Sequence, residues 1–447
     1  MTSTVRRAAA FALVGALSLV VPWVRRLEEP AFATLAAILP FLLVAAVALT
    51  VGSESRLFEL FARSGDRQDG KLYGLAGFAL SAAGLAILAV EFGMPVTVYV
   101  GTVFLLGVGN FGGHLVARYR DEPVVTTSGF VVAGFLAATG SQLAAGRLAD
   151  LPLSWPVVLF LAASGALLAG LVREALFRRD DPLVMVSVAL LLWLFAALPL
   201  SVTPTRIAVA LAVTAVLGVL SYLLQFASLP GMLTGVLLSL LTIVLGDYGW
   251  FVMLVAFFGV GGLSTKYGYE VKQQRGIAEE NEGARGTGNV LANSLVALVA
   301  VLAAAASSWF SASPRLFLFA FAGSLAAALA DTLSSEIGGL YDNPRLITSF
   351  EVVEPGTDGA VTWQGELAGL VGALLVAAIG FVGFAEVGLP GAAVVAAAGV
   401  AGMTVDSMLG ATLEGWLLGN QGVNLLATLA AALVGAALAV AVGLTTL

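Results

Sequence analysis

Apolar stretches long enough to cross a membrane follow one another along almost the whole chain. A helix that spans a bilayer needs about 20 mostly apolar residues, and about fifteen such stretches can be read in this sequence. Only 11% of the residues are charged, against about 25% in a typical soluble domain. The sequence therefore predicts an all-α fold, a polytopic integral membrane helix bundle of about 15 transmembrane helices. The predicted spans are 8–24, 31–51, 72–92, 95–115, 127–146, 154–172, 183–200, 206–226, 229–246, 249–264, 289–309, 316–338, 365–385, 390–412 and 423–445.

The residue types present limit the chemistry. The chain has no cysteine and one histidine, His114, which excludes a thiolate metal site, a histidine-based metal cluster and a Ser-His-Asp triad. A metal would have to be bound by carboxylates and other oxygens, and such ligands suit Mg²⁺. The expected partners are the lipid bilayer and small ligands, without nucleic acid.

Positive charges in the loops predict an orientation. The basic loops follow the second, fourth, sixth and tenth predicted spans and fall on one side if the helices alternate. The positive-inside rule makes that side cytoplasmic, which puts the N-terminus inside and the C-terminus outside in a cell membrane. Loops 265–288, 339–364 and 413–422 then share the cytoplasmic face. Arg6-Arg7 and the apolar run after them are read as a retained first helix, because no small-residue cleavage site follows.

The segment Val202–Thr205 is the expected boundary between two halves of the chain. We expect two transmembrane domains, residues 1–200 and 205–447.

Two aspartates at the ends of apolar runs are the strongest candidates for chemistry. Asp331 follows the run Phe317–Ala330 and precedes Glu336, and Asp406 ends a second run. Carboxylates within membrane helices are costly and usually functional. We therefore expect Asp331, Glu336 and Asp406 to bind Mg²⁺ and to be catalytic; the alternative is that they only bond neighbouring helices.

The loops beside these acids are rich in glycine and cations. A Pro-Gly-Thr-Asp-Gly sequence, residues 355–359, is typical of a turn whose backbone amides can bind an anion. The basic loop 265–288 could contact phosphates, or could serve only topology and anionic lipid. The expected phosphate- or substrate-binding residues are Lys266, Lys272, Arg285, Asn289, Asn293, Arg345, Gly356, Thr357, Gly359 and Asn424.

At these motifs the second half, about residues 205–447, resembles the integral membrane family that includes plant phytyl-phosphate kinase. The resemblance is carried in order by Thr265-Lys266, Asn289–Asn293, Ala330–Gly338, Pro355–Val361, Asp406–Thr412 and Asn424. It implies transfer of a phosphoryl group from a nucleoside triphosphate, CTP by preference, to an isoprenyl monophosphate with Mg²⁺. Asp358 departs from the family, where Asn is common.

The first half resembles a diverged member of the phytol or dolichol kinase class, through Phe61–Gly74 and Gly109–Arg118. That class typically has Asp where this chain has Asn110. Without that carboxylate Mg²⁺ would be bound poorly, so we expect an inactive or repurposed half. His114 is read as a residue that ends a helix.

The function expected from the sequence is an isoprenyl-phosphate kinase. Three rivals remain open at this point: a transporter of an ion or small anion, a lipid-phosphate cytidylyltransferase that releases pyrophosphate, and a scaffold without turnover. The transporter would show acids in interrupted helices of both halves.

Overall fold

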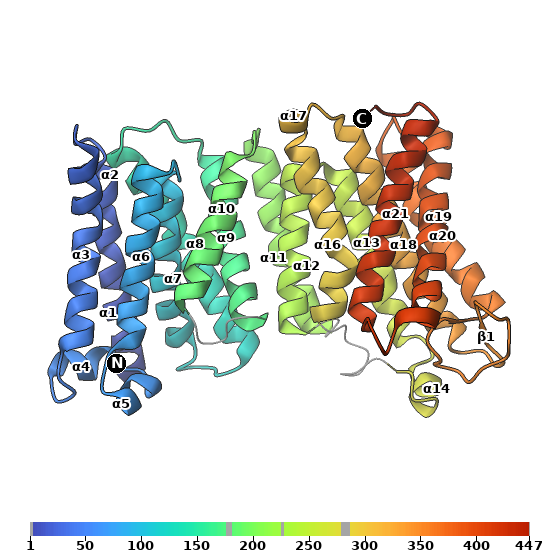
Figure 1. Cartoon of the computed structure of the whole chain (residues 1–447), viewed down its shortest axis with the longest axis horizontal. Coiled ribbons are helices and arrows are strands. Elements are labelled where there is room, and N and C mark those ends of the chain that lie inside the picture. Colours follow the sequence, from blue (N-terminus) through green and yellow to red (C-terminus); the bar gives the residue numbers. More distant parts are fainter. Residues whose placement is uncertain (1–2, 176–180, 225–227, 279–286, 447) are drawn as a thin grey trace. The chain divides into compact units, whose positions relative to one another are not determined.

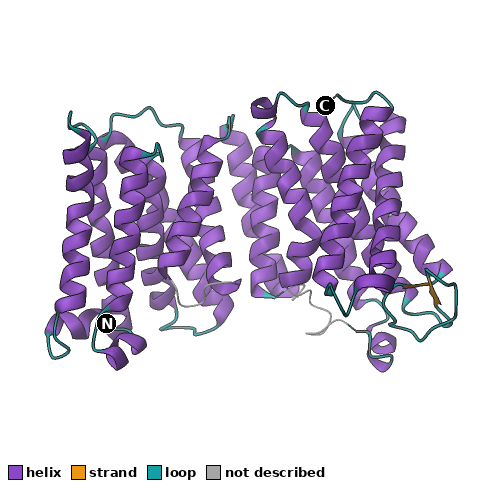
Figure 2. Ribbon diagram, viewed as in Figure 1, coloured by secondary structure: helices purple, strands orange, loops and turns teal. Residues whose placement is uncertain are grey.

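The computed structural model describes residues 3–175, 181–224, 228–278 and 287–446, and these residues are almost entirely helical (Figures 1 and 2). Among them, thirteen helices are long and apolar enough to cross a membrane. Two further apolar helices, Asp181–Ala197 and Leu229–Leu245, have 17 residues each. Every predicted span coincides with one of these helices to within a few residues at each end. The protein is a polytopic all-α membrane protein, as predicted.

The chain forms two compact units, Met1–Ala208 and Val209–Leu447. The helix α11 (Pro204–Leu224) begins in unit 1 and continues in unit 2. The other elements of unit 1 are α1 (Ser3–Gly15), η1 (Ala16–Leu19), α2 (Val20–Val24), α3 (Pro30–Thr50), α4 (Arg56–Phe61), α5 (Ser64–Asp69), α6 (Tyr73–Glu91), α7 (Val96–Val116), α8 (Pro123–Leu148), α9 (Trp155–Ala175) and α10 (Asp181–Ala197).

Unit 1 is packed around α7 and α9, the two most buried of its long helices. Glycines on α7 let α8 approach closely. A Cβ at Gly112 would lie 2.2 Å from the side chain of Ala133 and 2.8 Å from the carbonyl of Gly129. Such close packing of small residues is how helices associate where the lipid offers no hydrophobic driving force.

The first span begins earlier than predicted. The helix starts at Ser3 rather than near residue 8, so Arg6 and Arg7 lie within its first turns. Arginine is a good helix former, and a hydropathy boundary alone misses such residues. As a result, Arg7 belongs to the helical bundle rather than to a loop before it.

Unit 2 holds α12 (Leu229–Leu245), α13 (Tyr248–Lys266), α14 (Tyr269–Gln274), α16 (Thr287–Ala305), α17 (Ser307–Phe310), α18 (Pro314–Gly338), β1 (Arg345–Leu346), β2 (Ala360–Val361), α19 (Trp363–Gly383), α20 (Gly388–Leu413) and α21 (Asn420–Ala441). The central helix is α18, which packs against α13, α16, α19, α20 and α21. Its apolar face forms the core with Phe257, Leu325 and Val376. Gly365 and Gly369 of α19 lie against the carbonyls of Ser334 and Ala330, so small residues let α19 pack closely on α18.

One end of unit 2 carries its irregular structure. The helix α14, the antiparallel pair β1–β2 and the turn after α20 lie at this end, and α17 and the C-terminus lie at the other (Figure 1). Exposed Trp363 and Trp416 begin α19 and follow α20 at the same end. Because tryptophan favours the membrane–water interface, these residues mark the level at which the bundle meets water.

Candidate functional site

Asp331 and Asp406 come together between α18 and α20. Their carboxyl groups lie within hydrogen-bonding reach of each other. Each residue lies seven positions before the end of its helix, about 10 Å into the bundle at 1.5 Å per residue. Two ionised carboxylates in contact repel, and a shared proton or a cation relieves that repulsion. Within the described residues, Oδ2 of Asp406 is buried and has no hydrogen-bond partner.

Two further acids surround this pair. Glu414 follows α20, and burial raises its pKa, with further contributions from the negative charges of Asp358 and Asp331. Glu414 also acts electrostatically on Asp406. Four carboxylates from three segments therefore form one negative region, which can attract and neutralise a cation.

The turn that contains Gly359 packs onto the last two turns of α20. A Cβ at Gly359 would lie 2.4 Å from the amide nitrogen of Ala411 and 2.5 Å from the carbonyl of Ser407, and φ is +74°. Only glycine can both lie this close to the backbone of α20 and adopt this positive φ. Thr357 closes the turn through its hydroxyl, which donates to the carbonyl of Glu354 at 2.8 Å. Gly356 is the other residue of this turn with positive φ.

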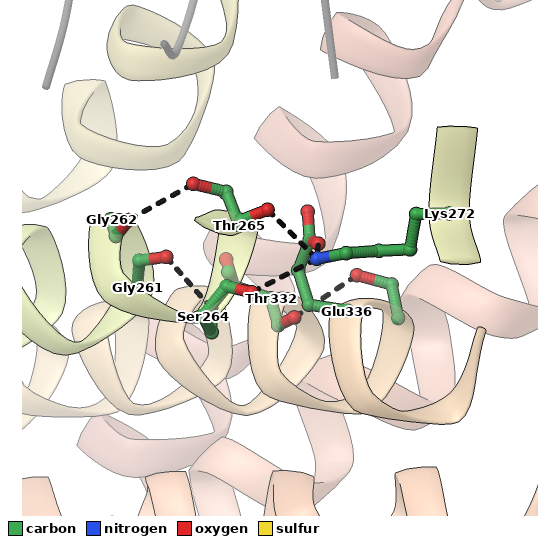
Figure 3. Close-up of polar contacts among 8 residues, drawn as sticks. Gly261, Gly262, Ser264, Thr265, Lys272, Thr332 and Glu336 are labelled. Carbon is green, nitrogen blue, oxygen red and sulfur yellow. Dashed lines mark hydrogen bonds and ion pairs between the residues drawn. The ribbon is translucent and has the colours of Figure 1, made fainter. Parts of the chain in front are cut away.

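Glu336 pairs with Lys272 rather than with the aspartates (Figure 3). The Nζ atom of Lys272 lies 2.5 Å from Oε2 of Glu336 and donates to the carbonyls of Ser264 and Thr265 at 3.0 and 2.8 Å. The Lys272 side chain is 2% exposed. An ammonium group has three donors, and these three acceptors account for all of them. The predicted phosphate contact of Lys272 would require one of these bonds to break.

Local sequence explains why Lys272 reaches this position. Gly268 has φ of +64° and turns the chain between α13 and α14. Lys272 then points back at the last turn of α13, where helix carbonyls run short of backbone donors. A cation at a helix C-terminus is also favoured by the helix dipole.

The donor set fits a two-carboxylate Mg²⁺ site better than the predicted three-carboxylate one. Among the described residues, no three His, Asp or Glu side chains are arranged to hold a metal ion. Asp331 and Glu336 diverge on α18 because five residues turn a helix by about 140°. However, Mg²⁺ commonly takes one or two carboxylates and completes its shell with waters and substrate phosphates. Asp331 and Asp406 meet that requirement, because Oδ2 of Asp406 has no hydrogen-bond partner among the described residues.

The other predicted cations bond backbone carbonyls. Lys266 donates to the carbonyl of Leu224 at 3.1 Å, and Arg345 donates to the carbonyl of Phe350 at 2.7 Å. Arg345 also belongs to β1, which pairs with β2. Guanidinium has five donors, so Arg345 keeps capacity for a ligand. Arg285 lies outside the described residues.

The predicted asparagines lie near the starts of α16 and α21. The Asn293 amide donates to the carbonyl of Asn289 at 3.0 Å, and the Asn424 amide donates to Oδ1 of Asn420 at 3.0 Å. The two helix starts are adjacent, because a Cβ at Gly288 would meet the side chain of Gln421.

Three residues that shape this end of unit 2 were not among the predicted site residues. Asp358 and Glu414 extend the acidic region, and Arg275 binds the carbonyls of Gly339 and Tyr341 and the carboxylate of Asp342. Glu414 could have been predicted, because it directly follows a membrane helix that itself carries an acid, Asp406.

The family that the chain matches covers most of unit 2. The family described as integral membrane protein DUF92 matches residues 212–432. An uncharacterized membrane protein of Methanocaldococcus jannaschii is 35% identical over 190 residues, which are 42% of this chain and 75% of that protein. No solved structure matches.

Two photosynthetic relatives are matched over about half their length. The chloroplastic protein VTE6 of Arabidopsis thaliana is 32% identical over 154 residues, 34% of this chain and 46% of VTE6. A membrane protein of Synechocystis is 37% identical over 144 residues, 31% of this chain and 54% of that protein. With the archaeal match and the family match in agreement, the chain belongs to the integral membrane protein DUF92 family.

Proposed function

We propose that this protein is an isoprenyl-phosphate kinase whose reaction centre is the Asp331–Asp406 pair. The observation that carries the proposal is the contact between these two acids within the bundle, with Oδ2 of Asp406 buried and unpartnered among the described residues. Two adjacent acids within a membrane bundle are costly. Their cost is offset when a divalent cation and its phosphate ligands bind.

The reaction transfers the γ-phosphoryl group of a nucleoside triphosphate, CTP by the family resemblance, to a prenyl monophosphate. An oxygen of the monophosphate forms a bond to the γ-phosphorus, and the bond from that phosphorus to the β,γ-bridging oxygen breaks. The products are a prenyl diphosphate and a nucleoside diphosphate. The attacking oxygen is already ionised near neutral pH, so no histidine base is needed. Such transfers depend mainly on positioning and on charge neutralisation.

The residues divide into two roles. Asp331 and Asp406 would hold Mg²⁺, which supplies charge neutralisation to the phosphates when bound. Gly356, Thr357 and Gly359 form the turn that would place backbone amides beside the phosphates, and Arg345 and Lys266 are candidate cations for the phosphate oxygens. Lys272 and Glu336 fix α14 and α13 against α18 and act by positioning.

The substrate's two ends fit the two environments of the site. Met408, two residues from Asp406, is exposed on α20, as are Leu370 and Leu374 on α19. A prenyl chain can lie along such lipid-facing surfaces while its phosphate reaches the acids near the interfacial tryptophans. The basic loops at this end favour a cytoplasmic orientation, where nucleotide is available.

Product analysis tests the proposal and its closest rival together. Purified protein in detergent receives geranylgeranyl or phytyl monophosphate, Mg²⁺, and CTP labelled at either the α- or the γ-phosphate. A kinase places only γ-label in a prenyl diphosphate, whereas a cytidylyltransferase places α-label in the lipid and releases pyrophosphate. Incorporation of neither label, with CTP or with any other nucleoside triphosphate, would contradict the proposal.

A further inference from the structure

Two adjoining cavities lie at one end of unit 1. Their volumes are about 190 and 280 Å³, and both are lined by Asn110, His114 and Arg173. Among the described residues, the charged side chains that line the larger cavity are Arg7, Arg63, Arg173 and Asp181. Three guanidinium groups therefore face one carboxylate, an excess of two positive charges.

The guanidinium groups are held in place before any ligand binds. Arg63 lies 2.6 Å from the carboxylate of Asp181 and 4.9 Å from the ring centre of Phe11. Arg173 lies 4.9 Å from the ring centre of Phe130 and donates to Oδ1 of Asn110. Stacking of a guanidinium on an aromatic ring fixes its plane and leaves the edges free to donate. Pre-organisation of this kind lowers the entropy lost on binding.

Asn110 sets the charge of the site. Its Oδ1 accepts from Arg173, and its Nδ2 donates to Asp181 at 3.4 Å. An amide can accept from a cation and donate to an anion at the same time. An aspartate here would repel Asp181 and would cancel one of the two excess positive charges.

Arg7 completes the group from α1. It donates to the carbonyl of Ala62 at 2.9 Å, which occupies one of its five donors. The charges of Arg7, Arg63, Arg173 and Asp181 all act on His114, so these groups surround one small space. Asp181 is 7% exposed.

We infer that the larger cavity of unit 1 binds the dianionic phosphate group of a phosphate monoester. The guanidinium fork matches phosphate oxygens in pairs, and two excess positive charges balance a dianion. The cavity also has an apolar wall formed by Ala8 and Phe11. The phosphate can belong to a free anion or to a membrane lipid headgroup. The site is separate from the Asp331–Asp406 centre and does not depend on the function proposed there.

Two binding measurements on the purified full chain test the inference. Equilibrium dialysis in detergent measures radiolabelled inorganic phosphate, and native mass spectrometry of nanodiscs measures dioleoyl phosphatidic acid against a phosphatidylcholine background. The test variants are Arg7→Gln and the isosteric Asn110→Asp. The control is Arg147→Gln, an exposed arginine at the other end of unit 1.

We expect the wild type and Arg147→Gln to bind alike. Arg7→Gln and Asn110→Asp should each weaken binding about tenfold or more, as loss of one charge-assisted bond does, with thermal midpoints that show folded protein. If both probes bind, a phosphate group alone is sufficient for binding. If phosphatidic acid binds and inorganic phosphate does not, the ligand is a lipid headgroup. No binding of either probe to the wild type would overturn the inference, as would binding by Asn110→Asp and Arg7→Gln that is as tight as that of the wild type. An equal loss in Arg147→Gln would also overturn it, because the attraction would then be non-specific.

Discussion

The ammonium group of Lys272 lies 2.5 Å from Oε2 of Glu336, although 64 positions separate the two residues in the sequence. The contact joins α14 to α18, and the same ammonium group bonds the last turn of α13 (Figure 3). One buried lysine therefore ties three helices together at the end of unit 2 that carries the candidate site.

Removal of Lys272 should destabilise the protein strongly. Lys272→Met keeps the length of the side chain but leaves Glu336 and the two carbonyls without their donor. Loss of one partner of a buried ion pair costs about 3–5 kcal/mol, and thermal unfolding in detergent should show a clearly lower midpoint. Glu336→Gln retains an acceptor for Lys272 and should cost less. A Lys272→Met midpoint equal to that of the wild type would show that the contact is not formed.

Gly359→Ala should displace the turn from α20. The new Cβ would lie within 2.5 Å of backbone atoms of Ser407 and Ala411, at φ of +74°. We expect a loss of stability of about 1–3 kcal/mol and at least a tenfold loss of phosphoryl transfer. The matched control is Gly415→Ala, with φ of +84° but nothing within 4 Å, which adds only the conformational cost of about 1–2 kcal/mol. Equal activity in the two variants would contradict a role for the turn.

The sequence predicted the helices well because each span must bury its backbone polar groups within a long apolar helix. It predicted Asp331 and Asp406 individually, because an acid at the end of an apolar run stands out. It did not predict which side chains would contact each other, such as Glu336 and Lys272. The contact between α18 and α14 depends on how Gly268 turns the chain and on packing between distant helices, neither of which leaves a periodic signal. For the same reason, the cavity around Arg7 and Asn110 was not predicted.

Asp406→Asn should stabilise the protein without Mg²⁺ and abolish its response to Mg²⁺. The amide can donate to Asp331 at every pH and so avoids the repulsion between two ionised carboxylates, a gain of up to about 1–3 kcal/mol. Wild-type protein should gain thermal stability when Mg²⁺ is added after chelation, because the ion binds the folded state. An Asp406→Asn variant with the wild-type Mg²⁺ response would argue against these carboxylates as its ligands.

The stability of the protein should fall as pH rises through the titration of Glu414. Burial, then Asp358 and Asp331, raise the pKa of Glu414 in the folded state. Between its unfolded value, about 4.3, and the raised value, the folded state binds more protons, so the free energy of unfolding decreases with pH. Urea unfolding in detergent at several pH values should show a shallower decrease for Glu414→Gln. Glu386→Gln, exposed at the other end of unit 2, should follow the wild type. Parallel profiles for all three proteins would contradict this assignment.

The most direct test of the central claim is the rate of label transfer from γ-labelled CTP to geranylgeranyl monophosphate by Asp331→Asn. The substitution keeps the shape of the side chain and removes its charge. If Asp331 and Asp406 form the reaction centre, the rate falls by about a hundredfold or more, while Glu386→Gln stays close to the wild-type rate. An Asp331→Asn protein that transfers label at the wild-type rate would contradict the account.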